Sequence, residues 1–152
     1  MTDALDPAAL DALERRIDGW LAAIAAGWMP VEAIERATGD ERRWYVRLRG
    51  EDKDFTTVWL TLGQRTLRYE TYVMPGPEEN DGALYEHLLR RNERLVGAHF
   101  SIGIEDAVFL RGELAVAAVT EVELDRVIGT LYATVEQTFQ ALLRIGFASR
   151  FA

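Results

Sequence analysis

The sequence predicts an α+β fold in which helices pack on an antiparallel sheet. Two observations support this: apolar residues recur at helical spacing in some segments, and they alternate with period two in others. The alternating segments are grouped in hairpins between the helical ones, in the order helix, three strands, helix, two strands, helix (α-βββ-α-ββ-α). Strands and helices do not alternate singly, which disfavours a doubly wound dinucleotide fold. No repeat or long linker divides the chain, so we expect one domain over residues 1–152.

The first predicted helix covers residues 6–26, where Asp6 can cap free amides and Pro7 suits the first helical position. Its apolar stripe consists of Leu10, Leu13, Ile17, Trp20, Leu21 and Ile24. After Pro30 we expect a short turn of helix that stops at Gly39.

Three strands are predicted next, over residues 43–49, 55–62 and 66–74. The segment RWYVRLR alternates cleanly, and the connections GEDKD and GQR have hairpin length. Neighbouring strands should therefore be antiparallel. Their content of aromatic and β-branched residues favours strand over helix.

A second helix is expected over residues 82–96, followed by strands over residues 98–104 and 107–114. Thr120 and Glu123 then predict a capping box at the start of a final helix of about six turns. The predicted buried stripe of the second helix consists of Leu84, Leu88, Leu89 and Leu95.

Composition limits the compartment and the class of partner. The chain has no cysteine, no basic segment followed by an apolar run at its start, and no apolar stretch of the ~20 residues that a membrane span needs. We therefore expect a cytoplasmic protein that does not enter the membrane. The net charge of −8 makes general nucleic-acid binding an unlikely function, because such binding relies on basic residues that neutralise phosphates.

No pattern in the sequence indicates catalysis. His87 and His99 lack the spacing of zinc ligands, and the acidic pairs at residues 78–79 and 105–106 fit helix capping and turn formation. There is no glycine-rich phosphate loop between a strand and a helix. We expect no cofactor, no metal and no enzymatic activity.

The informative feature is the side of the predicted sheet opposite Trp44, Val46 and Leu48. Simple alternation gathers aromatic rings and arginines there, a composition that is enriched at protein interfaces. The candidate partner-binding residues are Tyr45, Arg47, Trp59, Arg68, Glu70 and Tyr72. Two alternatives remain open at this point: a helix or loop of the same chain covers these residues, or single-stranded nucleic acid stacks on their rings.

Several ordered blocks resemble YbjN-domain proteins of the actinobacterial type. These blocks are RWYVRLRGEDKDFTTVWLTLGQRTLRYETYVMP, ALYEHLLRRNERL, FSIGIEDAVFLRGEL and RIGFASRF, and together they extend over about residues 43–151. The resemblance implies a fold like that of type III secretion chaperones, which are small, acidic, typically dimeric cytoplasmic proteins that hold an extended segment of a partner. The family is described as sensory transduction regulators, and it implies no catalytic residues for this chain.

The leading hypothesis is therefore a non-enzymatic interaction module, a homodimer or chaperone-like regulator that binds a protein client. The client would add to an exposed sheet edge or lie in an aromatic groove. The alternative is a small-molecule sensor or weak enzyme with a pocket between sheet and helices. Its best polar candidates are Glu70 and His99, although nothing in the sequence places them together.

Overall fold

The computed structural model describes residues 3–151, which form one six-stranded antiparallel sheet and three long helices. The strand order is β1-β2-β3-β4-β6-β5. The strands are β1 (Val31–Arg36), β2 (Arg43–Arg49), β3 (Phe55–Leu62), β4 (Thr66–Met74), β5 (His99–Ile102) and β6 (Val108–Ala115). The helices are α1 (Pro7–Ala25), α2 (Asp81–Asn92) and α3 (Glu121–Gly146), with short 3-10 turns η1 (Ile104–Asp106), η2 (Val116–Ala118) and η3 (Ala148–Phe151).

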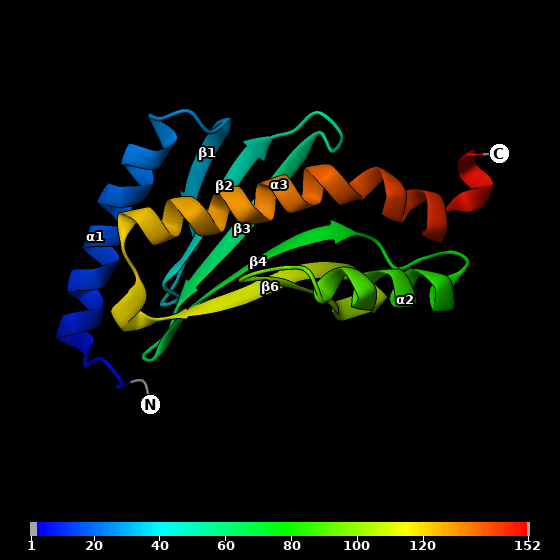
Figure 1. Ribbon diagram of the computed structural model, residues 1–152. Helices are drawn as coiled ribbons and strands as arrows, with labels where there is room; N and C mark the ends of the chain where they lie inside the picture. Colours follow the sequence, from blue (N-terminus) through cyan, green and yellow to red (C-terminus); the bar gives the residue numbers. More distant parts are fainter. Residues whose placement is uncertain (1–2, 152) are drawn as a thin grey trace.

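All three helices lie on one side of the sheet. Figure 1 shows α3 running across the strands, with α1 near β1 and α2 near β6. Helix α3 contacts both α1 and α2 as well as β3 and β4. The core fills the space between these layers, and its strand residues include Val46, Leu60, Leu67 and Leu110, none of which is exposed to solvent. Among the described residues, no helix is both long and apolar enough to cross a membrane.

The α+β class and the bounds of the three central strands are confirmed, but the expected element order lacks one strand. The segment predicted as a turn of helix after Pro30 is strand β1, which pairs with β2 through a bulge between Val31 and Ala33. Because β1 is short and rich in charge, its local pattern is weak, and the hydrogen bonds offered by the edge of β2 decide its conformation.

Helix α1 is attached to β2 by a buried indole. Trp44 is almost fully buried, and its Nε1 donates a hydrogen bond of 2.7 Å to the Asp18 carboxylate on α1. The guanidinium of Arg36 lies 4.5 Å from the centre of the Trp44 ring and also binds Asp18 and Glu14. The predicted cap is present as well, since Asp6 accepts a hydrogen bond from the Ala9 amide.

Two expectations about the other helices need correction. Helix α2 ends at Asn92, before the predicted end, and Leu89 is 69% exposed instead of buried. The capping box of α3 is only half formed. Thr120 accepts a hydrogen bond from the Glu123 amide, but the Glu123 side chain turns to Arg126, a charged partner that competes better than the backbone amide.

At Gly112, in β6, the backbone closely approaches the Gly97 carbonyl and the Tyr69 ring. A Cβ atom at Gly112 would lie 2.4 Å from the Gly97 carbonyl oxygen and 2.5 Å from the Tyr69 ring. This contact lets the Tyr69 hydroxyl donate a hydrogen bond to the Gly97 carbonyl.

We expect Gly112→Ala to destabilise the protein by about 1–3 kcal/mol, since the added methyl group has no room. Gly129, inside α3, has no atom within 4 Å of an added Cβ, so Gly129→Ala should stabilise the helix by up to about 1 kcal/mol. Urea unfolding of both variants measures the difference. Equal free energies of unfolding would contradict the close packing at Gly112.

Candidate functional site

The candidate site is the sheet surface that faces away from the helices, which we call the outer sheet face. Burial alternates strictly along β3 and along β4 up to Val73, so every second side chain points to this face. Its main members are Tyr45, Arg47, Arg49, Phe55, Thr57, Trp59, Arg68, Glu70, Tyr72, Phe109 and Arg111.

The structure places all six predicted partner-binding residues on this face, on the adjacent strands β2, β3 and β4. Tyr45 lies opposite Trp59, and Trp59 lies opposite Glu70. Arg47, Arg68 and Tyr72 are exposed, and the other three are partly exposed. The alternative in which a helix or loop of the same chain seals these side chains is therefore wrong for the described residues.

Contacts within the face hold its rings in fixed orientations. Tyr45 and Trp59 meet edge to face at 5.9 Å, and Tyr72 meets Phe109 in the same way at 5.6 Å. The Arg47 guanidinium lies 3.8 Å from the centre of the Phe55 ring. Such edge-to-face and cation–π contacts restrict side-chain rotation, so a binding partner would meet a surface that is already ordered.

Sequence reasoning missed the contribution of β6 and β5. Arg111 on β6 donates from Nε to Glu70 at 2.8 Å and from Nη1 to Ser101 on β5 at 3.1 Å, and its guanidinium lies 4.4 Å from the Phe109 ring. Alternation along the segment AVFLRGEL puts Phe109 and Arg111 on one side. Nothing in the sequence, however, shows that β6 pairs with β4.

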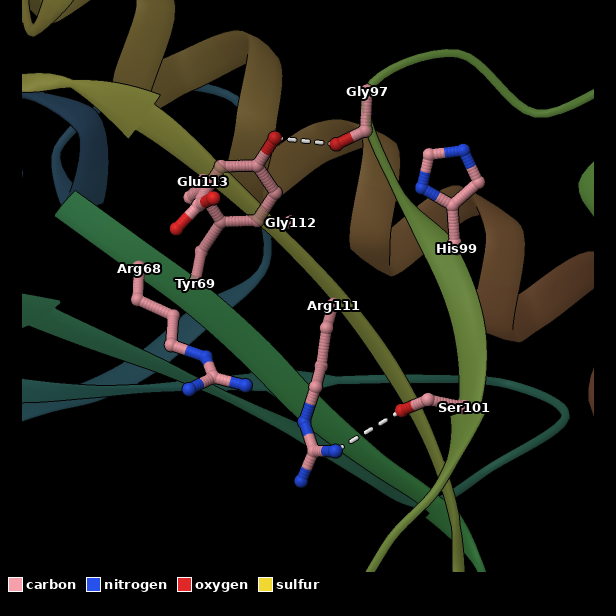
Figure 2. Close-up of a pocket in the computed structure, with 8 residues that line it drawn as sticks. All are labelled: Arg68, Tyr69, Gly97, His99, Ser101, Arg111, Gly112 and Glu113. Carbon is pink, nitrogen blue, oxygen red and sulfur yellow. Dashed lines mark hydrogen bonds between the residues drawn. The ribbon is translucent and has the colours of Figure 1, made fainter. Parts of the chain in front are cut away.

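A depression of about 590 Å³ opens beside these residues, where β5 begins and β6 continues. Figure 2 shows Arg68, Arg111, Ser101 and His99 around it, with the Tyr69–Gly97 hydrogen bond at its far end. The cross-strand register puts Arg111 between Glu70 and His99. The two polar candidates of the sensor hypothesis therefore share a neighbour, and the Glu70 carboxylate is paired with arginine.

The second histidine considered for chemistry, His87, is engaged in a structural contact. His87 accepts a hydrogen bond from Arg91 Nε at 2.8 Å, and burial together with the Arg91 charge lowers its pKa. No group of three histidine or acidic side chains within residues 3–151 is arranged to hold a metal ion.

Helix α3 anchors the turn between β2 and β3 at one end of the outer sheet face. The Glu136 carboxylate accepts hydrogen bonds from the amides of Glu51 and Asp52, and Tyr132 donates to the Arg49 carbonyl. A Cβ atom at Gly50 would lie 1.9 Å from a Glu136 side-chain oxygen, so the Glu136 carboxylate packs directly against the backbone of this turn.

Lys53, the only lysine of the chain, connects that turn to the face. Its Nζ donates to the carbonyls of Tyr72 and Val73 at 2.7 and 3.0 Å and lies 5.2 Å from the Tyr72 ring. Burial lowers the pKa of Lys53 to about 8, against the opposing influence of the Glu136 charge.

One edge of the sheet is blocked by a side chain. Asn92, the last residue of α2, accepts a hydrogen bond from the Phe100 amide at 2.7 Å and donates one to the Phe100 carbonyl at 3.1 Å. These are the main-chain groups of β5 that point away from β6. Asn92 thus occupies the position of a further strand, a common way to protect a sheet edge.

The architecture defines a protein with the type III secretion chaperone-like fold. The fold is similar to a chain of the heterodimeric ExoU–SpcU complex from the type III secretion system of Pseudomonas aeruginosa, with a TM-score of 0.55 and 15% sequence identity. The similarity covers 83% of this chain and 96% of the matched chain. The expected fold class is confirmed by this likeness, which at such low identity concerns the fold alone.

The family model YbjN, described as "Putative bacterial sensory transduction regulator", matches residues 16–144. The chain belongs to the YbjN family, as its sequence blocks predicted. Uncharacterized proteins of Mycobacterium bovis and Mycobacterium tuberculosis are each 38% identical to it over 104 residues, which cover 68% of this chain and 57% of theirs. One of Mycobacterium leprae is 35% identical over 107 residues, 70% of this chain and 58% of its own. The chain thus matches little more than half the length of these relatives.

The lowered pKa of Lys53 predicts a specific dependence of stability on pH. Between about pH 8 and pH 10.5 the unfolded lysine binds a proton that the folded one has released, so the free energy of unfolding should rise with pH in this window. Lys53→Met should lack that contribution. Urea unfolding just below pH 8 and again near pH 10 measures it, and an equal change in both proteins would contradict the assignment.

Proposed function

We propose that this protein is a non-enzymatic interaction module, a regulator or chaperone, which binds an extended segment of another protein across its outer sheet face. The observation that carries the proposal is the partly exposed row of Tyr45, Trp59, Glu70 and Arg111 on four adjacent strands. The membership in the YbjN family and the chaperone-like fold support an interaction role.

The energetics of the face favour binding of protein surface over catalysis. Tryptophan, tyrosine and arginine are the residues that most often dominate binding energy at interfaces. The rings are already fixed by their neighbours, so little side-chain entropy would be lost on binding. The acidic candidate for catalysis, Glu70, is 16% exposed, and its carboxylate is engaged in an ion pair with Arg111.

The sheet edges offer a second set of contacts to the same segment. Asn92 blocks the β5 edge, whereas β1 forms the opposite edge. Ala37 donates to the Arg43 carbonyl, and the alternation of an antiparallel ladder then directs the main-chain groups of Ile34 and Arg36 away from β2. A client segment that crosses the outer sheet face can form main-chain hydrogen bonds with these groups at the β1 edge.

We assign the homodimer contact to a different surface, the apolar patch formed by Leu89 of α2 and Ile102 of β5, which line one shallow depression. Leu89 is 69% exposed and Ile102 is 49% exposed. Exposed apolar side chains gathered in one region mark interaction sites. With the dimer placed here, the outer sheet faces of both subunits are free to bind clients in the cytoplasm.

Site-specific photo-crosslinking separates the two surfaces. A benzophenone amino acid in place of Thr57, on the outer sheet face, should crosslink a second kind of protein in cells. The same group in place of Ile102 should crosslink two copies of this chain, also in purified protein. Arg15, exposed on α1, provides the control position and should give neither product.

The outcome on a Trp59→Ala background decides the role of the face. We expect the Thr57 adduct to be lost and the Ile102 adduct to remain, with an unchanged circular dichroism spectrum. A Thr57 adduct that persists, or one that contains only this chain, would contradict client binding on the outer sheet face.

A further inference from the structure

Two arginine side chains lie side by side at the centre of the outer sheet face. The Arg68 and Arg111 side chains project from the neighbouring strands β4 and β6, and Glu70 lies between them. A single Glu70 oxygen, Oε2, is 2.8 Å from Arg111 Nε and 3.8 Å from Arg68 Nε. Figure 2 shows both guanidinium groups at the end of the depression away from Tyr69. Among the described residues, Glu70 is the only carboxylate that forms an ion pair with these arginines, although Glu113 lies opposite Arg68 in the register.

The two arginines differ in how many of their donors are used. Arg111 is fixed by Glu70, by Ser101 and by the Phe109 ring, and 27% of its side chain is exposed. Arg68 is 58% exposed, and its only contact among those of the described residues is the long one to Glu70. Glu113 also lines the depression but forms no ion pair with either guanidinium within residues 3–151. Each guanidinium carries five N–H donors, so most of those on Arg68 lack an acceptor from the protein.

We propose that the Arg68–Arg111 pair binds a carboxylate side chain, aspartate or glutamate, of the partner's extended segment. This inference rests on the proposed function and names the chemistry of the client. A carboxylate matches the planar fork of a guanidinium and accepts two parallel hydrogen bonds from it. Arg111 is held in place before binding, so the partly enclosed depression presents an ordered donor, while Arg68 closes on the ligand from the solvent side.

The surrounding residues fit the spacing of an extended segment. Side chains on one side of such a segment recur about every 6.6–6.8 Å. When an acidic residue of the segment binds the arginine pair, the next side chains on the same side of the segment therefore lie over the Trp59 and Tyr45 rings. The inferred client motif is an extended segment in which an acidic residue alternates with residues that stack on rings.

Single-stranded nucleic acid fits this surface less well. Tight binding to a phosphate backbone needs several uncompensated cations along a strand. On the outer sheet face, Arg49 pairs with Glu32, Arg43 pairs with Glu41, and Arg111 pairs with Glu70. Among the described residues of the face, Arg47 and Arg68 are the arginines without a close carboxylate, and two separated cations suit a single carboxylate better than a continuous phosphate backbone.

Fluorescence anisotropy with defined probes tests the inference. The probes are labelled peptides of alternating threonine and glutamate, the same peptide with glutamine in place of glutamate, and an oligothymidine strand. The glutamate peptide should bind about tenfold more tightly than the glutamine peptide, the preference expected from one charge-assisted contact. Millimolar inorganic phosphate should displace the peptide only weakly, since a free anion lacks the contacts to the rings.

Three single variants have three different expected outcomes for the binding of the glutamate peptide. Arg68→Gln should remove the preference for glutamate. Glu70→Gln should strengthen glutamate-peptide binding, because it frees both guanidinium groups from their internal carboxylate. Arg49→Gln, on the same face but paired with Glu32, is the matched control and should leave the preference unchanged.

Four results would overturn the inference. The acidic preference is absent if the glutamate and glutamine peptides bind equally, or if neither binds at millimolar concentration. The Thr57 crosslink tests the proposed function separately. Tighter binding of oligothymidine than of the glutamate peptide would assign the face to nucleic acid. Full displacement by phosphate would assign the arginine pair to a free anion.

Discussion

The structure depends on the one-sided packing of its helices against a single pleated sheet. Helices α1 and α3 bury every second residue of the central strands, and the intervening residues are left to solvent or to a partner. A shift of one residue in the register of β3 would put Trp59 into the core and Val58 on the surface. The matched pairs Tyr45–Trp59 and Val46–Val58 show how firmly both faces constrain that register.

The same arrangement orders the outer sheet face before any partner arrives. Trp44 ties β2 to α1 from within, and Glu136 and Tyr132 hold the β2–β3 turn against α3. Lys53 extends this link to the β4 carbonyls beneath the Tyr72 ring. The helical layer thus fixes the strand ends that carry the exposed rings, which explains how a surface of partly exposed aromatic and arginine side chains can remain well defined.

Much of this could be predicted from the sequence, and the failures have physical reasons. Period-two alternation placed all six candidate residues on one face, because the pleat itself creates that pattern. Strand β1 was missed because its six residues form a strand only when β2 offers an edge. The role of Arg111 was missed because the pairing of β6 with β4 joins segments that are distant in sequence. Leu89 lies inside α2 but points about 100° around the helix axis from the buried Leu88, so the apolar run alone assigned it wrongly to the core.

The central claim is that a partner covers the outer sheet face in the cell, and hydroxyl-radical footprinting tests it most directly. Oxidation of individual residues would be compared between intact cells and dilute purified protein. The account predicts that Trp59 and Tyr72 are protected in cells. Trp28, which is 78% exposed and lies beside the end of α1 and the start of α3, should be oxidised equally in both. Equal oxidation of Trp59 and Tyr72 in cells and in dilute solution would contradict the account.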